Sequence, residues 1–531
     1  MTAEHLAAAR PAPGHGDHLV ADQREVVRFL AAPASHGPGT LRVERIDTHG
    51  AMVFLAGARA YKLKRAVRFP YMDFSTPALR RAACQREVDL NRRTAPDLYL
   101  GVMPVSRAAD GRLSLGGAGA AVDWLVVMRR FDQDGLFDRL AQAGRLTSGL
   151  MRALADEIAA FHRAAERLSG AAGGGAAGTR AVIEENIDEL AERPDLFAGA
   201  ELDAFGQSSR AALARVRGLL DKRLAEGFVR RCHGYLPLRT ICPIGGGPTI
   251  FDAIEFNDAI ACIDVLYDLA FLLMDLDHRN LRPYANLVLN RYLQHRRDLA
   301  GLEAMPLFLS MRAAVRAKVS VSMAESKAGA KEAERLHAEA GAYFRAARAY
   351  LTPCRPRLVA LGGLSGSGKT DLGRRLAPGL GAPPGALHLR SDVLRKARFG
   401  VDELTRLPAG AYNPEETRQV YAELASRARA GLRAGQSVIA DAVYAKPEER
   451  AAIEAIARGL GVPFTGLWLE APEDVLCGRV TARRDDASDA TPDVVRRQLD
   501  ADPGPLTWHR LDTAGAREAV ATAAERILSS R

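Results

Sequence analysis

Residues 358–376 read LVALGGLSGSGKTDLGRRL, and this stretch predicts a phosphate-binding loop between a strand and a helix. An apolar run precedes the loop and leucines follow it at helical spacing, as this arrangement requires. The loop fits the pattern G-x-x-x-x-G-K-[ST], in which successive backbone N–H groups point at phosphate oxygens. A chance glycine-rich turn is the alternative, and the two correct flanks argue against it. The residues expected to bind the nucleotide are Gly363, Leu364, Ser365, Gly366, Ser367, Gly368, Lys369 and Thr370.

Two side chains of this loop carry its chemistry. We expect Lys369 to reach the β- and γ-phosphates as a catalytic residue, and the Thr370 hydroxyl to hold Mg²⁺. The loop therefore predicts that the chain binds a nucleoside triphosphate, with ATP and Mg²⁺ as the expected cofactors.

The string LRSDVLRKARFG, residues 389–400, follows the next predicted strand and carries two candidate catalytic residues, Asp392 and Arg395. Ligands of open parallel sheets bind beyond the carboxyl ends of the strands, so Asp392 is expected to face the γ-phosphate and to accept a proton from an attacking hydroxyl. Arg395 lies on the same helical face and suits an anionic group of the acceptor. The alternative for Asp392 is a cap on a helix that begins near Val393.

Further candidates follow the next strand. Asp441 closes the apolar run SVIAD, residues 437–441, as a Walker-B carboxylate does when it helps to position Mg²⁺. Beyond it, Arg479, Arg483 and Arg484 suit a mobile lid that closes over the transferring phosphoryl group and neutralises its charge. A solvated basic face is the alternative for these arginines.

Composition bounds the class of protein. The 531 residues are 47% apolar, which is ample for folded cores. The net charge of +9 arises from 73 basic and 64 acidic residues that are mixed along the chain, so nucleotide substrates explain it as well as nucleic acid does. The chain has neither a membrane-length apolar run nor a signal pattern, and we expect a cytoplasmic protein without a membrane partner. The six cysteines lie far apart and form no C-x-x-C pair, so the sequence indicates neither a zinc site nor a disulfide framework. They are Cys84, Cys232, Cys242, Cys262, Cys354 and Cys477.

Patterning divides the chain into three parts. Residues 1–22 are rich in Ala, Pro, Gly and His and are expected to form an unstructured tail. Short β-like runs at 43–67, a helix at 79–91 and a strand at 124–128 predict a small sheet with one helix. Mostly helical sequence follows, in which we expect a flexible surface loop at 169–179 and a β-rich island at 228–256.

The segment TPCRP, residues 352–356, breaks the last of these helices and marks a domain boundary. The remaining sequence alternates strands and helices, with ALHLR, SVIAD and FTGLWL as buried strands. This alternation predicts a parallel sheet that is covered on both faces.

Residues 357–531 resemble the small P-loop kinases that include gluconate kinase, the zeta toxins and the kinase half of phage polynucleotide kinase. The order GLSGSGKT, RSDVLR, VIADAVYAKPEER and arginine lid matches theirs, with the strongest likeness to polynucleotide kinase around Asp392, Arg395, Asp441 and Arg450. The resemblance implies that Asp392 acts as base toward the accepting hydroxyl and that Arg395 contacts a phosphate of the acceptor. The acceptor is left open, because this scaffold serves sugars, antibiotics, nucleotide sugars and polynucleotide ends.

Residues 25–350 resemble the aminoglycoside phosphotransferase and protein-kinase-like fold. The resemblance implies that Lys64 in AYKLKRAV is the nucleotide-binding lysine, although Lys62 points to the same face of the strand. It also implies that Glu87 is the ion-pair partner of this lysine, that Asp252 is a metal ligand, and that VVMRRF is the hinge.

The resemblance breaks at the catalytic loop, where the family pattern H-G-D-x-H-x-x-N is replaced by HGYLPLRTI. His233 and Gly234 remain, but Tyr235 replaces the proton-accepting Asp and Thr240 replaces the metal-binding Asn, and Pro237 replaces the second His. A neutral phenol is a poor proton acceptor at pH 7. We therefore interpret this region as a pseudokinase, with a kinase that uses Glu255 or a relocated carboxylate as the competing hypothesis. Asp264 and Asp268 look structural.

The chain as a whole resembles bacterial fusions of an aminoglycoside-phosphotransferase-like domain with a P-loop ATPase or kinase domain of AAA type. The predicted fold class is α/β and α+β: a two-lobed protein-kinase-like domain at 23–350 followed by a P-loop NTPase domain with a parallel sheet at 357–531. The first hypothesis is a kinase that phosphorylates a hydroxyl of a small molecule or a nucleic acid end. The alternatives are an ATP-driven switch with little transferase activity, and an active small-molecule phosphotransferase in the N-terminal domain.

Lys369→Ala is expected to abolish most ATP binding and turnover, because it removes the side-chain charge aimed at the β- and γ-phosphates, at a cost of roughly 3 kcal/mol. Lys64→Ala is expected to matter far less. Labelled ATP, followed for binding and turnover in both variants, tests this. Equal loss of turnover in the two variants would mean that the N-terminal domain is the active kinase.

Overall fold

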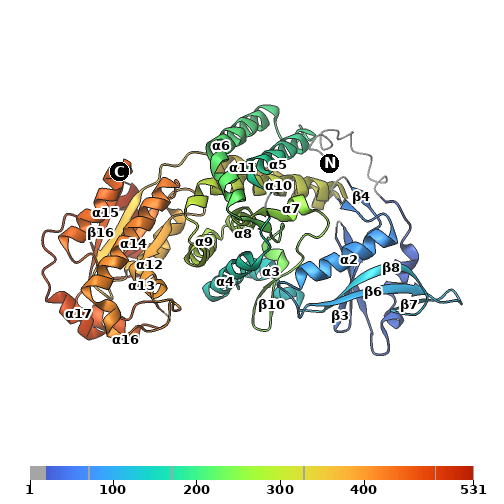
Figure 1. The fold of residues 1–531 in the computed structure, drawn as a ribbon, viewed down its shortest axis with the longest axis horizontal. Helices are drawn as coiled ribbons and strands as arrows, with labels where there is room; N and C mark the ends of the chain where they lie inside the picture. The colour runs from blue at the N-terminus through green and yellow to red at the C-terminus, as the bar shows by residue number, and fades with distance from the viewer. Residues whose placement is uncertain are drawn as a thin grey trace.

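The computed structural model describes residues 19–48, 50–69, 72–168, 170, 173–326, 329–484 and 486–529. The predicted tail at 1–22 lies outside these residues except for its last four. Figure 1 shows a sheet-containing lobe at one end of the molecule, a group of helices in the middle, and the C-terminal α/β unit at the other end. Each helix of the described ranges is too short or too polar to cross a membrane.

The N-terminal lobe is built on a six-stranded antiparallel sheet with the strand order β1-β2-β3-β8-β6-β7. Helix α2 (Pro77–Asn91) lies on this sheet, where Cys84 and Val88 pack against apolar side chains of β2 and β8. The predicted small sheet with one helix is therefore confirmed. The strands are β1 (Val43–Asp47), β2 (Ala51–Ala56), β3 (Arg59–Lys64), β6 (Tyr99–Arg107), β7 (Leu113–Leu115) and β8 (Ala120–Arg129).

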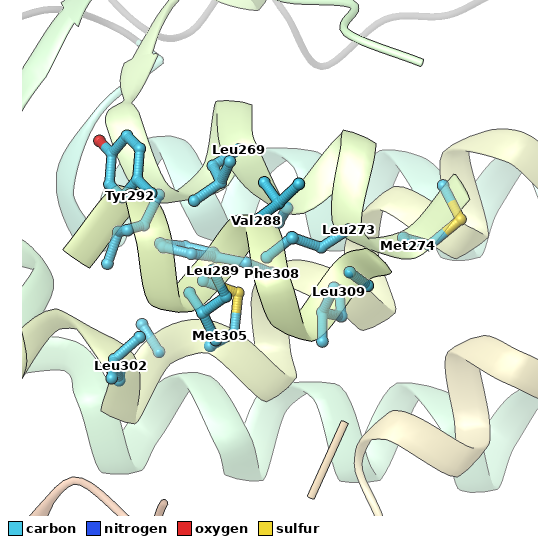
Figure 2. Close-up of a cluster of buried hydrophobic side chains, with 14 of the residues drawn as sticks. Leu269, Leu273, Met274, Val288, Leu289, Tyr292, Leu302, Met305, Phe308 and Leu309 are labelled. Atoms are coloured by element: carbon cyan, nitrogen blue, oxygen red, sulfur yellow. The ribbon is translucent and has the colours of Figure 1, made fainter. Parts of the chain in front are cut away.

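The second lobe is mostly helical. Its core gathers α8, α9 and α10, whose apolar side chains point toward one another, as Figure 2 shows for Leu269, Val288 and Phe308. The predicted β-rich island forms short strands beside this core, namely β9 (Val229–Arg231), β10 (Ile241–Ile244) and β11 (Gly247–Ile250). The main helices are α4 (Ser148–Ala164), α5 (Gly175–Ala191), α6 (Gly199–Ala225), α8 (Val265–His278), α9 (Arg282–Arg296), α10 (Met305–Ser326) and α11 (Ala330–Tyr350).

The expectation of a flexible loop at 169–179 is wrong for its second half. Helix α5 begins at Gly175, and the backbone N–H of Ala176 donates to Asp221 of α6 over 2.9 Å. A Cβ atom at Gly175 would lie 3.1 Å from both Asp221 and Leu224, so the small residues here permit two helices to pack closely. Gly/Ala-rich composition is typical of linkers, but in this segment it serves packing.

The C-terminal unit contains a five-stranded parallel sheet with the order β14-β15-β13-β16-β17, which confirms the predicted parallel sheet. Side chains alternate between its faces: Val359 and Leu361 pack with α12 and α18, whereas Leu358 and Ala360 pack with α14 and α15. Strand β17 (His509–Asp512) was not predicted. The other elements are β13 (Leu358–Gly363), β14 (Leu387–Arg390), β15 (Val438–Asp441), β16 (Phe464–Glu470), α12 (Lys369–Leu376), α13 (Ser391–Arg398), α14 (Pro414–Arg433), α15 (Pro447–Leu460), α16 (Glu473–Ala482), α17 (Pro492–Leu499) and α18 (Arg517–Ser529).

Helix α9 of the second lobe docks on the edge of this sheet. Asn286 and Asn290 donate from their side-chain amides to the carbonyl oxygen of Ala386 over 3.0 and 3.2 Å, and the N–H of His388 donates to Asn290 Oδ1 over 2.8 Å. A strand at the edge of a sheet has backbone N–H and C=O groups without a partner strand, and here the amide side chains of α9 form hydrogen bonds with these groups. The second lobe thus fixes β14, the strand that leads to Asp392.

A buried ion triad supports the second lobe. Arg223 is 2% exposed and donates to both carboxylate oxygens of Asp264, over 2.7 and 2.8 Å, and to Asp298 over 2.8 Å. Asp264 also caps α8 by accepting the N–H of Leu266 over 2.8 Å. The structural role predicted for Asp264 is confirmed.

Arg223→Ala is expected to lower the free energy of unfolding of the second lobe by about 3–5 kcal/mol, because it leaves two buried carboxylates without their cation. Arg210→Ala is the matched control: Arg210 pairs with Glu184 on the surface, and we expect a change below about 1 kcal/mol. Denaturant unfolding of the full chain measures both. Equal losses in the two variants would contradict the assignment.

Candidate functional site

The phosphate-binding loop has the backbone that its glycines predict. Gly363 and Gly366 have φ values of 128° and 85°, a region that side chains disfavour. A Cβ atom at Gly366 would also lie 2.6 Å from the carbonyl oxygen of Leu476. Helix α12 begins at Lys369, so its N-terminus opens onto the loop. One N–H of the loop, that of Ser365, donates to Gln498 Oε1 of α17 over 2.9 Å.

The side chain of Lys369 folds over its own loop. Its Nζ donates to the carbonyl oxygens of Gly363 and Leu364 over 2.8 and 2.9 Å. Burial lowers the pKa of this lysine, and the carboxylates of Asp441 and Asp392 oppose the shift. Lys369 therefore contacts its own loop and interacts electrostatically with the predicted metal ligand Asp441 and the predicted base Asp392.

The predicted metal ligands meet directly. The Thr370 hydroxyl donates to Asp441 Oδ2 over 2.7 Å, and the same oxygen accepts from His388 Nε2 over 3.2 Å. Burial by itself raises the pKa of Asp441, but the His388 hydrogen bond and nearby Lys369 hold it at about 2. A hydroxyl and an ionised carboxylate are oxygen ligands that suit Mg²⁺, so the pair fits the ion expected beside ATP phosphates.

Asp392 lies in the first turn of α13, but it does not cap that helix. The cap position is Arg390, and no capping hydrogen bond from a side chain is found in the described structure. Burial raises the pKa of Asp392, while Arg390 and a hydrogen bond with Ser488 act against the rise. The helix-cap alternative is therefore not supported, and the carboxylate stays a candidate base.

Arg395 differs from expectation. It is 6% exposed, donates to the carbonyl oxygen of Ala411 over 2.8 Å, and lies 4.8 Å from the ring centre of Tyr412. Its guanidinium thus holds the turn that precedes α14, and contact with an acceptor phosphate stays a prediction. Arg450 is also buried, where it donates to backbone carbonyls that include those of Tyr444 and Pro503.

The lid arginines divide into different roles. Arg479 donates to the carbonyl oxygen of Thr513 over 2.5 Å and lies 3.5 Å from that of Gly366, so it joins the end of β17 to the phosphate loop. Arg483 has a buried Nη1 atom without a hydrogen-bond partner among the described residues, and its charge acts on Lys369. Arg484 is exposed. Of the three, Arg483 is the one that remains suited to a phosphoryl group.

Sequence reasoning missed two residues beside Asp441. His388 was hidden within the apolar strand ALHLR, and Arg390 stood next to the motif residue Asp392 without a pattern of its own. In the sheet, Arg390 lies opposite Asp441 in the register of β14 and β15. Its position at the carboxyl end of a predicted parallel strand was the signal that could have identified it.

Both candidate nucleotide lysines of the N-terminal domain lie on β3. Lys64 is 2% exposed and pairs with Glu87 over 2.6 Å and with Glu255. Lys62 keeps 14% side-chain exposure and pairs with Glu87 over 2.8 Å and with Asp252 over 2.6 Å. Because Lys64 is enclosed, the expectation that it contacts a nucleotide is not supported, and Lys62 is the better candidate.

The altered catalytic loop keeps its scaffold. Asp268 accepts the backbone N–H groups of His233 and Gly234 over 3.1 and 2.9 Å, and a hydrogen bond from His162 over 3.1 Å. Burial raises the pKa of Asp268, but the interaction with His162 holds it at about 2. This carboxylate fixes the loop, as its predicted structural role requires.

The substituted positions of that loop are occupied by other contacts. The Tyr235 hydroxyl accepts from Arg316 over 3.0 Å and from Arg239. The Thr240 hydroxyl donates to the carbonyl oxygen of Pro237 over 2.9 Å. Neither hydroxyl is oriented by a base or paired with a metal-binding carboxylate in the described structure, which favours the pseudokinase interpretation.

Comparison with known proteins follows the same division of the chain. The family described as AAA domain matches residues 358–502. The chain is 32% identical over 482 residues to protein Rv2004c of Mycobacterium tuberculosis (strain ATCC 25618 / H37Rv), covering 89% of this chain and 92% of that protein. It is also 31% identical over 120 residues to the adenylyl-sulfate kinase of Myxococcus xanthus (strain DK1622), covering 22% of this chain and 60% of that enzyme.

Two solved structures are similar to separate parts. A choline/ethanolamine kinase family protein from Mesorhizobium loti is 15% identical, with a TM-score of 0.36, and the match covers 62% of this chain and 98% of that one. A sugar kinase from Janibacter sp. HTCC2649 is 22% identical, with a TM-score of 0.26, over 33% of this chain and 95% of that one. The AAA-domain match falls on the residues that hold the phosphate-binding loop, and this part of the chain is an ATP-dependent kinase or ATPase domain of P-loop type.

His388→Ala is expected to raise by about tenfold the Mg²⁺ concentration that supports half-maximal ATP binding, because residues that hydrogen-bond to metal-binding carboxylates orient them. His388→Gln replaces the ring N–H by an amide N–H donor and should recover part of the loss. Titration of Mg²⁺ with a fluorescent ATP analogue measures this, and His295→Ala, whose ring pairs with Asp156 away from the loop, is the control. An unchanged Mg²⁺ titration in His388→Ala would refute the role of this contact.

Proposed function

The chain belongs to the family of the mycobacterial protein Rv2004c, and from this premise we propose that its P-loop domain transfers the γ-phosphoryl group of ATP to a hydroxyl acceptor. The observation that carries the proposal is Asp392, a carboxylate in the first turn of α13 whose pKa is raised by burial and which interacts electrostatically with Lys369. A protein that only binds ATP as a switch, with little chemistry, has no need of such a second carboxylate beside Asp441.

The side chains divide the reaction between them. Lys369 and the N–H groups of the loop bind the β- and γ-phosphates, and Asp392 accepts the proton of the attacking hydroxyl. Thr370 and Asp441 would hold Mg²⁺, which would neutralise charge on the phosphate oxygens. Arg483, whose Nη1 is buried without a partner among the described residues, stabilises the charge of the transferring group.

The N-terminal domain is proposed to bind or regulate rather than to transfer phosphate. Tyr235 and Thr240 stand at the expected base and metal positions, and their hydroxyl groups already bond to Arg316 and Pro237.

The six cysteines are free, which supports the predicted cytoplasmic location.

A second candidate function is an ATP-driven switch between the two domains. It is favoured by one chain of contacts: Asn290 of α9 bonds the backbone of His388, whose ring bonds Asp441 beside Thr370. Nucleotide binding at Thr370 can be transmitted to α9 along these hydrogen bonds. The switch needs no acceptor, and this separates it from the kinase.

Asp392→Asn keeps the shape of the side chain and removes the base. Transfer from labelled ATP to an acceptor, sought in a panel of sugars, nucleosides, aminoglycosides and 5′-hydroxyl oligonucleotides, should drop by about 10²-fold while ATP affinity stays near wild type. The wild-type rate should also fall as the pH is lowered through the raised pKa of Asp392, because only the ionised form accepts a proton.

Transfer that persists undiminished in Asp392→Asn would refute this mechanism. Transfer to a member of the panel by the Lys369→Ala variant would instead assign the activity to the N-terminal domain. Asp371→Asn is the control, since Asp371 lies on the exposed side of α12 and pairs with Arg375.

A further inference from the structure

Arg390 is a buried cation in the P-loop domain whose hydrogen bonds are incomplete. Its side chain is 9% exposed, and its Nε atom is buried without a hydrogen-bond partner among the described residues. A guanidinium group stays charged at every accessible pH, and a buried unpaired N–H is costly. A ligand that accepts a hydrogen bond at Nε would remove this cost.

The position of Arg390 identifies the kind of ligand. Its Nε lies 4.0 Å from Asp441 Oδ2, the oxygen that accepts from Thr370. Arg390 ends β14 opposite Asp441, so both side chains lie at the carboxyl edge of the sheet beside the phosphate loop. In the proposed function, Lys369 and the loop N–H groups bind the β- and γ-phosphates from the side of α12. Of these two groups, the terminal γ-phosphate has the free oxygens that a cation beside Asp441 could also contact.

One nitrogen of the Arg390 guanidinium group is bonded to a carboxylate. Asp486, which follows α16 in the segment of the lid, accepts from Arg390 Nη2 over 3.1 and 3.2 Å. A carboxylate oxygen of Asp486 also lies 3.8 Å from Arg374. Burial by itself raises the pKa of Asp486, but the positive charges of Arg390 and Arg483 lower it below its ordinary value. An aspartate of the lid is thus surrounded by arginines in the manner of a bound anion.

The same segment is fastened at a second point. Asp489 Oδ2 accepts from Lys396 and from the Tyr412 hydroxyl over 2.5 Å each, and from the N–H of Leu407 over 3.0 Å. Lys396 is 1% exposed, so this contact anchors the segment firmly. Asp486 and Asp489 thus have separate partners, so that breaking the contact of Asp486 with Arg390 would leave the contacts of Asp489 intact.

We propose that Arg390 binds the γ-phosphate of ATP and that Asp486 competes with this phosphate for the same guanidinium group. The inference rests on the proposed use of ATP at the P-loop, but it requires no knowledge of the acceptor. When ATP binds, the γ-phosphate replaces the Asp486 carboxylate at Arg390 and also satisfies Nε. ADP has no γ-phosphate and leaves the Arg390–Asp486 pair in place, so the pair acts as a discriminator between the two nucleotides.

The test is a double-mutant cycle on nucleotide affinity, measured by calorimetry on the full chain with Mg²⁺ and either AMP-PNP or ADP. Arg390→Gln is expected to weaken AMP-PNP binding by about tenfold or more and ADP binding by less than about twofold. Asp486→Asn is expected to strengthen AMP-PNP binding by about fivefold without changing ADP binding. In the double variant this strengthening should disappear, because Asp486 acts through Arg390.

Arg355→Gln is the matched control, since Arg355 precedes β13 and donates to the carbonyl oxygen of Gly461 at the opposite edge of the sheet, and it should change neither affinity. Arg390→Lys keeps the charge but not the forked geometry, and thermal unfolding of each variant shows that it is folded. If Arg390→Gln does not fold, Arg390→Lys takes its place in the cycle with Asp486→Asn. The strengthening of AMP-PNP binding by Asp486→Asn should again disappear in the double variant.

Equal weakening of AMP-PNP and ADP in Arg390→Gln would overturn the inference, as would no weakening of either. If Asp486→Asn still strengthened AMP-PNP binding in the double variant, Asp486 would not compete with the γ-phosphate for Arg390. Failure of the proposed function looks different: Lys369→Ala would then bind AMP-PNP as wild type does, or Asp392→Asn would leave transfer unchanged, whatever the result for Arg390.

Discussion

One carboxylate oxygen, Oδ2 of Asp441, joins the parts of the P-loop domain on which its chemistry depends. It accepts the Thr370 hydroxyl from α12 and the His388 ring from β14, and it lies 4.0 Å from Arg390 at the end of the same strand. The ionised state of Asp441 is held by these neighbours against the effect of burial. The oxygen therefore sets the distance between the phosphate loop and the strand that leads to Asp392.

The helical lobe contacts the same strand through α9. The edge strand β14 carries His388 and Arg390, and its outer backbone groups are paired by Asn286 and Asn290 of α9. A free edge strand would move more readily and would expose unpaired N–H and C=O groups. The docking helix holds β14, and with it His388 and Arg390, against the helical lobe.

The N-terminal domain keeps the backbone contacts of the loop in which Tyr235 and Thr240 replace the Asp and Asn of the family pattern. Asp268 still holds the backbone of His233 and Gly234, yet Tyr235 bonds to arginines instead of to a substrate. Packing and backbone hydrogen bonds stabilise a loop regardless of whether its side chains react. Retention of the fold with loss of the reactive groups fits a domain that now contributes a surface and a docking helix.

The sequence by itself determined those features whose cause is local. The spacing of apolar residues placed the strands and helices of both regions, and the residues of the phosphate loop were identifiable because each has a role that its neighbours in the chain define. Other features depend on residues far apart in the chain, and only the tertiary structure decided them. The burial of Arg395 and Lys64 was not evident from their motifs, and Arg390 and His388 lie beside Asp441 because β14 pairs with β15. A glycine-rich stretch at 175–179 became a packed helix because α6 lies against it. Local patterns fix which face of an element is apolar, but burial and charge pairing depend on which elements meet, and that is a property of the whole fold.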